Sequence, residues 1–148
     1  MSVVEVEEPS ARSQLCETVL RDLPEWFGIE SATAAYIRDV AELPTLGIGD
    51  DAIFSLKLHT PLAAEVYVMG VRRSRHGPGL GTALVQAAEE YLRARGVEYL
   101  QIKTLGPSDP DEGYARTRAF CDARRFAALE ELHELWEHNP CLLMVKRL

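Results

Sequence analysis

Hydrophobic positions recur along this chain with two different periods, and their alternation predicts the helices and strands. Spacings of three and four residues, typical of a helix with one buried face, run over 10–23, 31–43, 80–95 and 112–124. Short runs rich in β-branched, aromatic or alternating apolar residues predict strands at 3–6, 45–48, 52–59, 64–71, 99–105, 126–135 and 141–146. Ser31 is the expected cap of the second helix, and Pro44 is expected to stop it.

This order of elements predicts an α/β fold. Strands alternate with helices in the middle of the chain, and hairpin-like pairs of strands stand toward both ends. Such an order is typical of a mixed sheet covered by helices. Because the chain has 148 residues, with no internal repeat and no linker-like stretch, we expect residues 1–148 to form a single domain. A core of that size needs no disulfide or metal to hold it together.

Composition excludes several classes of partner and indicates the cellular compartment. A formal net charge of −7 argues against nucleic acid as the main partner, because binding phosphates requires a basic face. No apolar run approaches the roughly 20 residues of a membrane span, and the acidic first thirty residues argue against a secretory signal. Three scattered cysteines predict no disulfide framework, so the expected location is a reducing cytoplasm. The spacing of His133, His138 and Cys141 fits no common zinc pattern, so we expect no metal site.

The most informative stretch is 71–84, which lies between an expected strand and an amphipathic helix. Gly77, Gly79 and Gly81 let the backbone approach a ligand, and the first N–H groups of a helix have no intrahelical partners. Together with the helix dipole, these donors form a site suited to a pyrophosphate, although a tight turn that merely starts a helix explains the loop equally well. The loop has no lysine, which excludes a Walker motif. Thr82 stands where a dinucleotide fingerprint needs its third glycine.

This loop resembles the acetyl-CoA signature of the GNAT superfamily of N-acetyltransferases, Gln/Arg-x-x-Gly-x-Gly/Ala. His76 stands in place of the usual arginine or glutamine, and Gly79 and Gly81 match the two small residues. Two further blocks occur in the family's order: 64–71 resembles its central strand, and 117–126 resembles its late helix. The resemblance runs from about residue 45 to the C-terminus. It implies a GNAT-like fold, with a mixed, mostly antiparallel sheet flanked by about four helices.

The resemblance further implies an enzyme that binds acetyl-CoA and transfers the acetyl group to an amine by direct attack in a ternary complex. Backbone groups of the central strand would hold the pantetheine arm and the thioester carbonyl, with an N–H directed at the developing oxyanion. The residues expected to contact the coenzyme are Met69, Gly70, Val71, Arg75, His76, Gly77, Gly79, Leu80, Gly81, Thr82 and Tyr114.

Two side chains are candidates for proton transfer. Glu65 stands where some family members keep a general base, and a solvated glutamate at a strand end is the alternative; Tyr67 and His59 are weaker candidates. Cys121 stands where many relatives carry a tyrosine that protonates the coenzyme sulfur. A thiol, with a reference pKa of about 8.5, can donate a proton but is shorter, so unassisted departure of the thiolate is the alternative. Arg125 replaces a glycine of the family pattern.

The acceptor is expected to be a small-molecule or peptide amine, and the acidic surface favours a cationic one. Trp26, Phe27 and Tyr36 are expected to shape the acceptor side or to belong to the core. Two other function classes compete: a catalytically weak acyl-CoA-binding module or sensor, and an interaction domain whose glycine loop binds nothing. Strands near the C-terminus would form a sheet edge able to pair in a homodimer.

Overall fold

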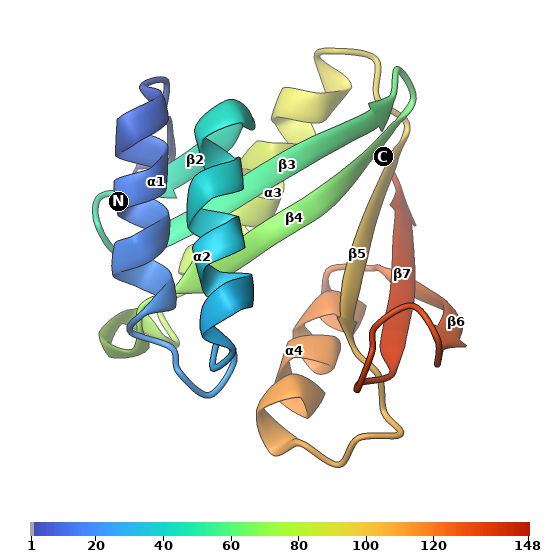
Figure 1. The fold of residues 1–148 in the computed structure, drawn as a ribbon. Coiled ribbons are helices and arrows are strands. Elements are labelled where there is room, and N and C mark those ends of the chain that lie inside the picture. The colour runs from blue at the N-terminus through green and yellow to red at the C-terminus, as the bar shows by residue number, and fades with distance from the viewer. Residues whose placement is uncertain (1) are drawn as a thin grey trace.

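Seven strands form one sheet in the computed structural model of the chain, which describes residues 2–148 (Figure 1). The strands are β1 (Val4–Glu5), β2 (Thr45–Ile48), β3 (Ala52–Thr60), β4 (Ala63–Val71), β5 (Tyr99–Leu105), β6 (Ala127–Leu132) and β7 (Cys141–Arg147). Their order in space is β1-β2-β3-β4-β5-β7-β6, so β6 is the C-terminal edge. Within residues 2–148, only β4 and β5 run parallel; the other neighbouring pairs are antiparallel. The predicted mixed, mostly antiparallel sheet is confirmed.

In the described part of the chain, four α-helices flank the sheet: α1 (Pro9–Leu20), α2 (Glu30–Asp39), α3 (Leu80–Arg93) and α4 (Glu112–Ala123). Two short 3-10 turns add η1 (Val40–Glu42) and η2 (Arg73–Arg75). Helices α1 and α2 lie across one face of β2–β4, and α3 lies behind it (Figure 1). Among residues 2–148, no helix combines the length and apolar character that crossing a bilayer requires.

The cap of the second helix was predicted wrongly, whereas the helical segment does end near Leu43, before Pro44, as predicted. Ser31 lies inside α2, which begins at Glu30 after the extended residue Ile29. The Thr33 hydroxyl donates to the Phe27 carbonyl at 3.1 Å, which ties the first turn to the preceding loop without a serine cap. The α-helix ends at Asp39, and η1 carries the chain on in a tighter turn. Glu30, in the first turn, receives a two-pronged hydrogen bond from Arg21 at the end of α1.

The two faces of the sheet bury separate hydrophobic clusters. Leu84, Ala88 and Leu92, on one side of α3, pack with Phe54 on one face. Val19, with other residues of α1, packs with Ile53 and Val68 on the opposite face. A Cβ on Gly70 would stand 3.0 Å from Val19 Cγ1, so the missing side chain lets α1 approach β4 closely. These two clusters fix the position of β4, the strand that carries the candidate site.

Strands β4 and β5 stay paired over only part of their length. Their register ends at Val66↔Ile102, and beyond it the two strands diverge (Figure 1). On its other side, β4 pairs with β3 in a register that jumps from Leu56↔Val66 to Ser55↔Val68. Tyr67 is therefore an extra residue, a β-bulge, at the point where the strands part. The bulge changes the direction of β4 and opens the sheet.

Candidate active site

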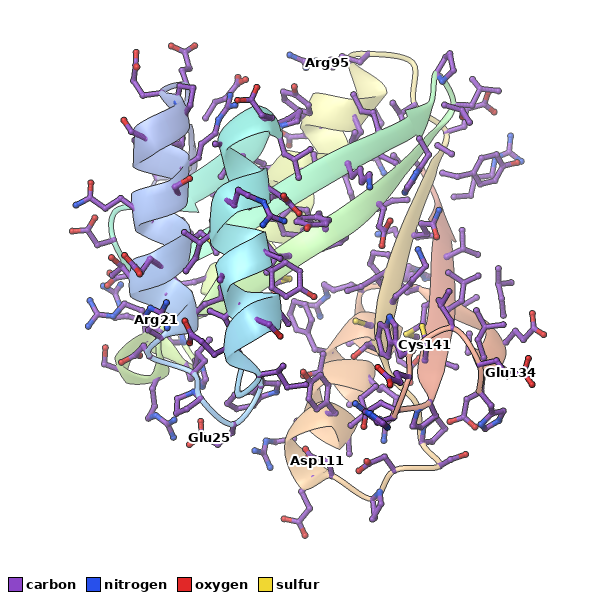
Figure 2. All side chains as sticks on the ribbon, viewed as in Figure 1. Arg21, Glu25, Arg95, Asp111, Glu134 and Cys141 are labelled. Carbon is purple, nitrogen blue, oxygen red and sulfur yellow. The ribbon has the colours of Figure 1, made fainter. Side chains whose placement is uncertain are left out.

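A cleft of about 920 Å³ opens where β4 and β5 separate. Its walls come from the loop between α1 and α2, the second half of β4, the glycine loop with the start of α3, the end of β5, α4, and the loop between β6 and β7. Glu25 on the first of these loops and Asp111 at the start of α4 both line it, and Figure 2 shows them at the same end of the molecule. The cleft therefore collects segments that are distant in the sequence.

The glycine loop presents unpaired backbone donors to this cleft. Gly77 and Gly79 have φ values of +99° and +86°, and Gly79 is the residue that caps α3. A Cβ on either glycine would meet no heavy atom of residues 2–148 within 4 Å, so the backbone conformation alone requires glycine there. The Gly79 carbonyl accepts the Ala83 N–H at 3.0 Å, which starts the helix. The N–H groups of the first helical turn have no intrahelical acceptor and suit an anion.

Gly81 has a different role, because its φ is not positive. A Cβ there would lie 3.2 Å from Phe120 Cζ and 3.3 Å from Met69 Cε. The start of α3 therefore contacts both α4 and β4 at Gly81. A larger residue would push against Phe120 and Met69 and so disturb the contact between these three elements.

Side chains of the loop are bound to the protein itself. Arg75 Nη1 donates to Asp51 Oδ2 at 2.6 Å, and His76 Nε2 donates to the Val71 carbonyl at 2.6 Å. Arg73 forms an ion pair with Glu25 of the loop between α1 and α2. These contacts hold the loop in its shape, so its capacity for an anion rests first on the backbone N–H groups.

The structure brings the expected coenzyme contacts together around this cleft. All of them belong to its lining: Met69, Gly70, Val71, Arg75, His76, Gly77, Gly79, Leu80, Gly81, Thr82 and Tyr114. Their role in binding stays a prediction, supported by this placement. Met69, Gly70 and Val71 lie beyond the last rung between β4 and β5, so their β5-facing backbone groups are free of that partner strand.

Glu65, the expected base, lies outside the cleft lining formed by the described residues. Its side chain is only 13% exposed; Oε1 is 2.7 Å from His59 Nε2, and Oε2 accepts from Lys103 Nζ at 3.1 Å. Both carboxylate oxygens are therefore engaged. Glu65 precedes the bulge and so stays on the paired part of β4, whereas Lys103, on the diverging part of β5, lines the cleft.

Cys121 and Tyr114 line the α4 wall of the cleft. Burial raises the pKa of the Cys121 thiol to about 11, so the thiol is protonated at neutral pH. The Tyr114 hydroxyl donates to the Trp26 carbonyl at 2.9 Å, and burial raises the pKa of Tyr114 to about 12. Tyr114 thus fastens α4 to the loop between α1 and α2.

Aromatic rings make up much of the remaining lining: Trp26, Phe27, Tyr36, Tyr67 and Trp136. The Tyr36 ring meets Phe27 edge to face at 6.0 Å between centroids and Tyr67 at 5.3 Å. Sequence reasoning missed Trp136 and Lys103. Trp136 lies in an irregular loop, where no periodicity predicts which way a side chain faces. Lys103 lies in a strand, and the alternation of side chains along a strand could have suggested that Lys103 faces the same side as Gln101.

Potential metal ligands stay dispersed. Among residues 2–148, no three His, Cys, Asp or Glu side chains are grouped so that they could hold a metal ion. His133 lies 3.3 Å from Glu131, and Cys141 is a buried residue of β7 (labelled in Figure 2). The geometry gives no support to a metal centre in this part of the chain.

Comparison with known proteins agrees with this geometry. Residues 50–120, which hold β4, the glycine loop and most of α4, match the profile described as the Acetyltransferase (GNAT) family. Residues 50–120 of this chain belong to this family. The chain is also 40% identical over 81 residues to a mycothiol acetyltransferase of Beutenbergia cavernae, a match that covers 53% of this chain. That match spans a quarter of the relative's own length, 25%.

Solved structures share the fold of the whole chain. The aminoglycoside 6'-N-acetyltransferase from Enterococcus faecium superposes with a TM-score of 0.73 at 18% identity, covering 99% of this chain and 97% of the other. A GNAT family acetyltransferase from Elizabethkingia anophelis with acetyl-CoA bound gives 0.73 at 12% identity, with coverages of 99% and 97%. At these identities the similarity establishes the GNAT fold and leaves the acceptor undefined.

Proposed function

We propose that this GNAT domain is an acetyl-CoA-dependent N-acetyltransferase that acetylates a primary amine of a small molecule or peptide in a ternary complex. The observation that carries the proposal is the loop at 77–82: it lines the cleft, has positive φ at Gly77 and Gly79, and leads into the first turn of α3, whose N–H groups have no intrahelical acceptor. The name of the Beutenbergia relative and the acetyl-CoA bound to the Elizabethkingia protein support it. We extend the proposed domain over residues 1–148 and place it in the cytoplasm.

The proposed coenzyme site uses the backbone more than charged side chains. The pyrophosphate would accept hydrogen bonds from the loop and from the first turn of α3, where the helix dipole adds to the attraction. The pantetheine arm would follow Met69, Gly70 and Val71 and pair with the backbone groups that β5 leaves free. Tyr114 would flank the arm from α4.

The proposed reaction joins the amine nitrogen to the thioester carbon and breaks the carbon–sulfur bond. A backbone N–H of β4 would stabilise the charge that develops on the carbonyl oxygen. The leaving thiolate needs a proton, and Cys121 is the candidate donor on the α4 wall, since its thiol is protonated at neutral pH. The aromatic residues Phe27, Tyr36 and Tyr67 of the cleft lining would contact the acceptor.

Release of free thiol from acetyl-CoA, followed with a panel of primary amines, tests the proposal. The panel should include aminoglycosides, polyamines and peptides with a free N-terminus, because the chain carries a net charge of −7. We expect thiol release that depends on both substrates, together with an acetylated product found by mass spectrometry. Coenzyme binding without turnover over a wide panel would contradict the enzymatic proposal.

A further inference from the structure

A hydrogen bond from Tyr67 to Asp39 connects the cleft with the solvent. Tyr67 lines the cleft, and its hydroxyl donates to Asp39 Oδ2 at 2.6 Å. Asp39 is the last residue of α2, and its side chain is 40% exposed. The bond falls within the 2.5–2.7 Å range typical of a hydroxyl that donates to a carboxylate. A proton that reaches the Tyr67 oxygen therefore has a short path to water.

The backbone gives Tyr67 a special position on this path. It is the bulge residue of β4, directly after Val66, which forms the last rung with β5. Its ring is fixed edge to face by Tyr36, and Lys57 Nζ lies 5.9 Å from the ring centroid. The bulge thus sets Tyr67, a residue of the cleft lining, at the point where β4 and β5 separate, with its hydroxyl bonded to Asp39.

Glu65, two residues earlier, has a different environment. Both of its oxygens are engaged by His59 and Lys103, and it lies outside the cleft lining formed by residues 2–148. The ionisable groups around the Tyr67–Asp39 pair are Tyr36 and Arg38 on α2, Lys57 and His59 on β3, Glu65 on β4 and Lys103 on β5. Of the two carboxylates here, Asp39 and Glu65, only Asp39 accepts a hydrogen bond from a hydroxyl of the cleft lining, that of Tyr67.

We propose that Tyr67 and Asp39 carry the proton that the acceptor amine must lose. As the acceptor ammonium gives a proton to the Tyr67 oxygen, the Tyr67 hydroxyl proton moves to Asp39, which then releases it to water. The relay converts an ammonium and a carboxylate into an amine and a carboxylic acid, so charge and atoms balance without another reactant. The neutral amine then attacks the thioester carbon and the carbon–sulfur bond breaks. The leaving thiolate takes a proton from Cys121, and the proton that the nitrogen loses on becoming an amide restores the Cys121 thiol. This inference rests on the proposed function.

The electrostatics suit release from Asp39. The hydrogen bond from Tyr67, followed by the one from Arg38, holds the pKa of Asp39 below its usual value. Asp39 therefore gives up a transferred proton readily to water at neutral pH. Burial, with Asp39 nearby, raises the pKa of Tyr67, so its hydroxyl keeps a proton and passes one on only as it receives another.

The test compares kcat against pH for Tyr67→Phe, Asp39→Asn and Glu65→Gln, with the best amine of the panel at saturation. Tyr67→Phe keeps the ring and removes only the hydroxyl. We expect Tyr67→Phe and Asp39→Asn each to lower kcat tenfold to a hundredfold at pH 7 and to leave the KM for acetyl-CoA unchanged. The loss should shrink as the pH rises toward the pKa of the amine, because an amine that is already neutral needs no relay. The double variant should be no slower than Tyr67→Phe alone.

Matched controls are Tyr99→Phe and Asp50→Asn, which make the same chemical changes outside the cleft lining of residues 2–148. Thermal midpoints and circular dichroism show that each variant folds. A kcat loss that is equal at every pH, or no loss, in Tyr67→Phe would overturn the relay. So would an alkaline-recoverable loss found in Glu65→Gln alone. A wild-type protein that turns over no amine would overturn both the relay and the proposed function, whereas the outcomes above, with wild-type turnover intact, overturn the relay alone.

Discussion

The indole ring of Trp26 meets the imidazole ring of His76 edge to face, with centroids 6.1 Å apart and planes at 80°. This contact joins the loop between α1 and α2 to the glycine loop. The backbone carbonyl of Trp26 accepts a hydrogen bond from the Tyr114 hydroxyl at 2.9 Å. Trp26 therefore touches both the proposed coenzyme loop and the α4 wall, and a ligand in the cleft must change its surroundings.

Tryptophan fluorescence should report coenzyme binding. The chain has two tryptophans, Trp26 and Trp136, and both line the cleft. Trp136→Phe leaves Trp26 as the sole reporter. We expect its emission to change saturably when coenzyme A is added, and the titration midpoint to match that of the unmodified protein. Emission that stays constant in both proteins would contradict binding in this cleft.

Replacement of Gly79 should separate binding from folding. Its φ of +86° costs an L-residue roughly 1–2 kcal/mol, and Gly96, near the other end of α3, has a comparable φ of +77°. Gly79→Ala and Gly96→Ala should therefore lower the free energy of unfolding in urea by similar amounts. Only Gly79→Ala should also raise the KM for acetyl-CoA, about tenfold, because it disturbs the N–H groups of α3. An equal KM in the two variants would remove the loop from the coenzyme site.

Cys121 should set the alkaline limit of turnover if it protonates the leaving thiolate. A donor works while it is protonated, and burial raises the pKa of this thiol to about 11. We expect kcat to hold up to about pH 10 and then to fall as the thiol ionises. Cys121→Ala should lower kcat tenfold or more at neutral pH, whereas Cys141→Ala, a buried thiol outside the cleft lining of the described residues, should not. The same kcat in the two variants would exclude Cys121 as the proton donor.

Arg125→Gly should stabilise the protein. Arg125 has a φ of +72°, and it follows α4 in a turn where Phe126 N donates to the Cys121 carbonyl at 3.0 Å and Arg125 N to the Asp122 carbonyl at 2.9 Å. This pair of bonds is the Schellman motif, whose left-handed position normally holds glycine. Glycine removes the left-handed backbone penalty of roughly 1–2 kcal/mol from the folded state. It also lowers stability by about 0.5–1 kcal/mol, because glycine gives the unfolded chain more conformational entropy. We therefore expect a net gain of about 0.5–1 kcal/mol in the free energy of unfolding.

The control for this substitution is Asp122→Gly, inside the last turn of α4, where φ is helical. Glycine there should destabilise the protein by about 0.5–1 kcal/mol. A loss of stability in both variants would show that Arg125 is not strained.

Features that depend on nearby residues could be predicted from the sequence. The periodicity over 80–95 predicted a helix directly after the glycine loop, and α3 does begin at Leu80, since such a pattern depends on a few adjacent residues. The strands at 45–48 and 99–105 were predicted with the bounds observed. Arg125 was recognised as a departure from the family pattern; the structure adds that the chain keeps the left-handed turn without the glycine.

Features that depend on register between distant strands could not be predicted. The bulge at Tyr67 arises from the pairing of β4 with β3, and no residue of β4 alone encodes it. The partners of Glu65 are His59 on β3 and Lys103 on β5. Because both lie on other strands, the sequence around Glu65 could not predict that its carboxylate is engaged. The bond from Tyr67 to Asp39 spans 28 positions and joins a strand to the end of a helix. Such contacts follow from tertiary packing.

Isothermal titration calorimetry with coenzyme A tests the central claim most directly. The claim is that backbone N–H groups of the 77–82 loop bind the diphosphate and so orient the thioester along β4. We expect one site per chain in the wild-type protein and at least a tenfold weaker affinity, about 1.4 kcal/mol, in Gly79→Val. Gly96→Val should bind like the wild type. Absence of heat in the wild type, or the same affinity in Gly79→Val, would contradict the account.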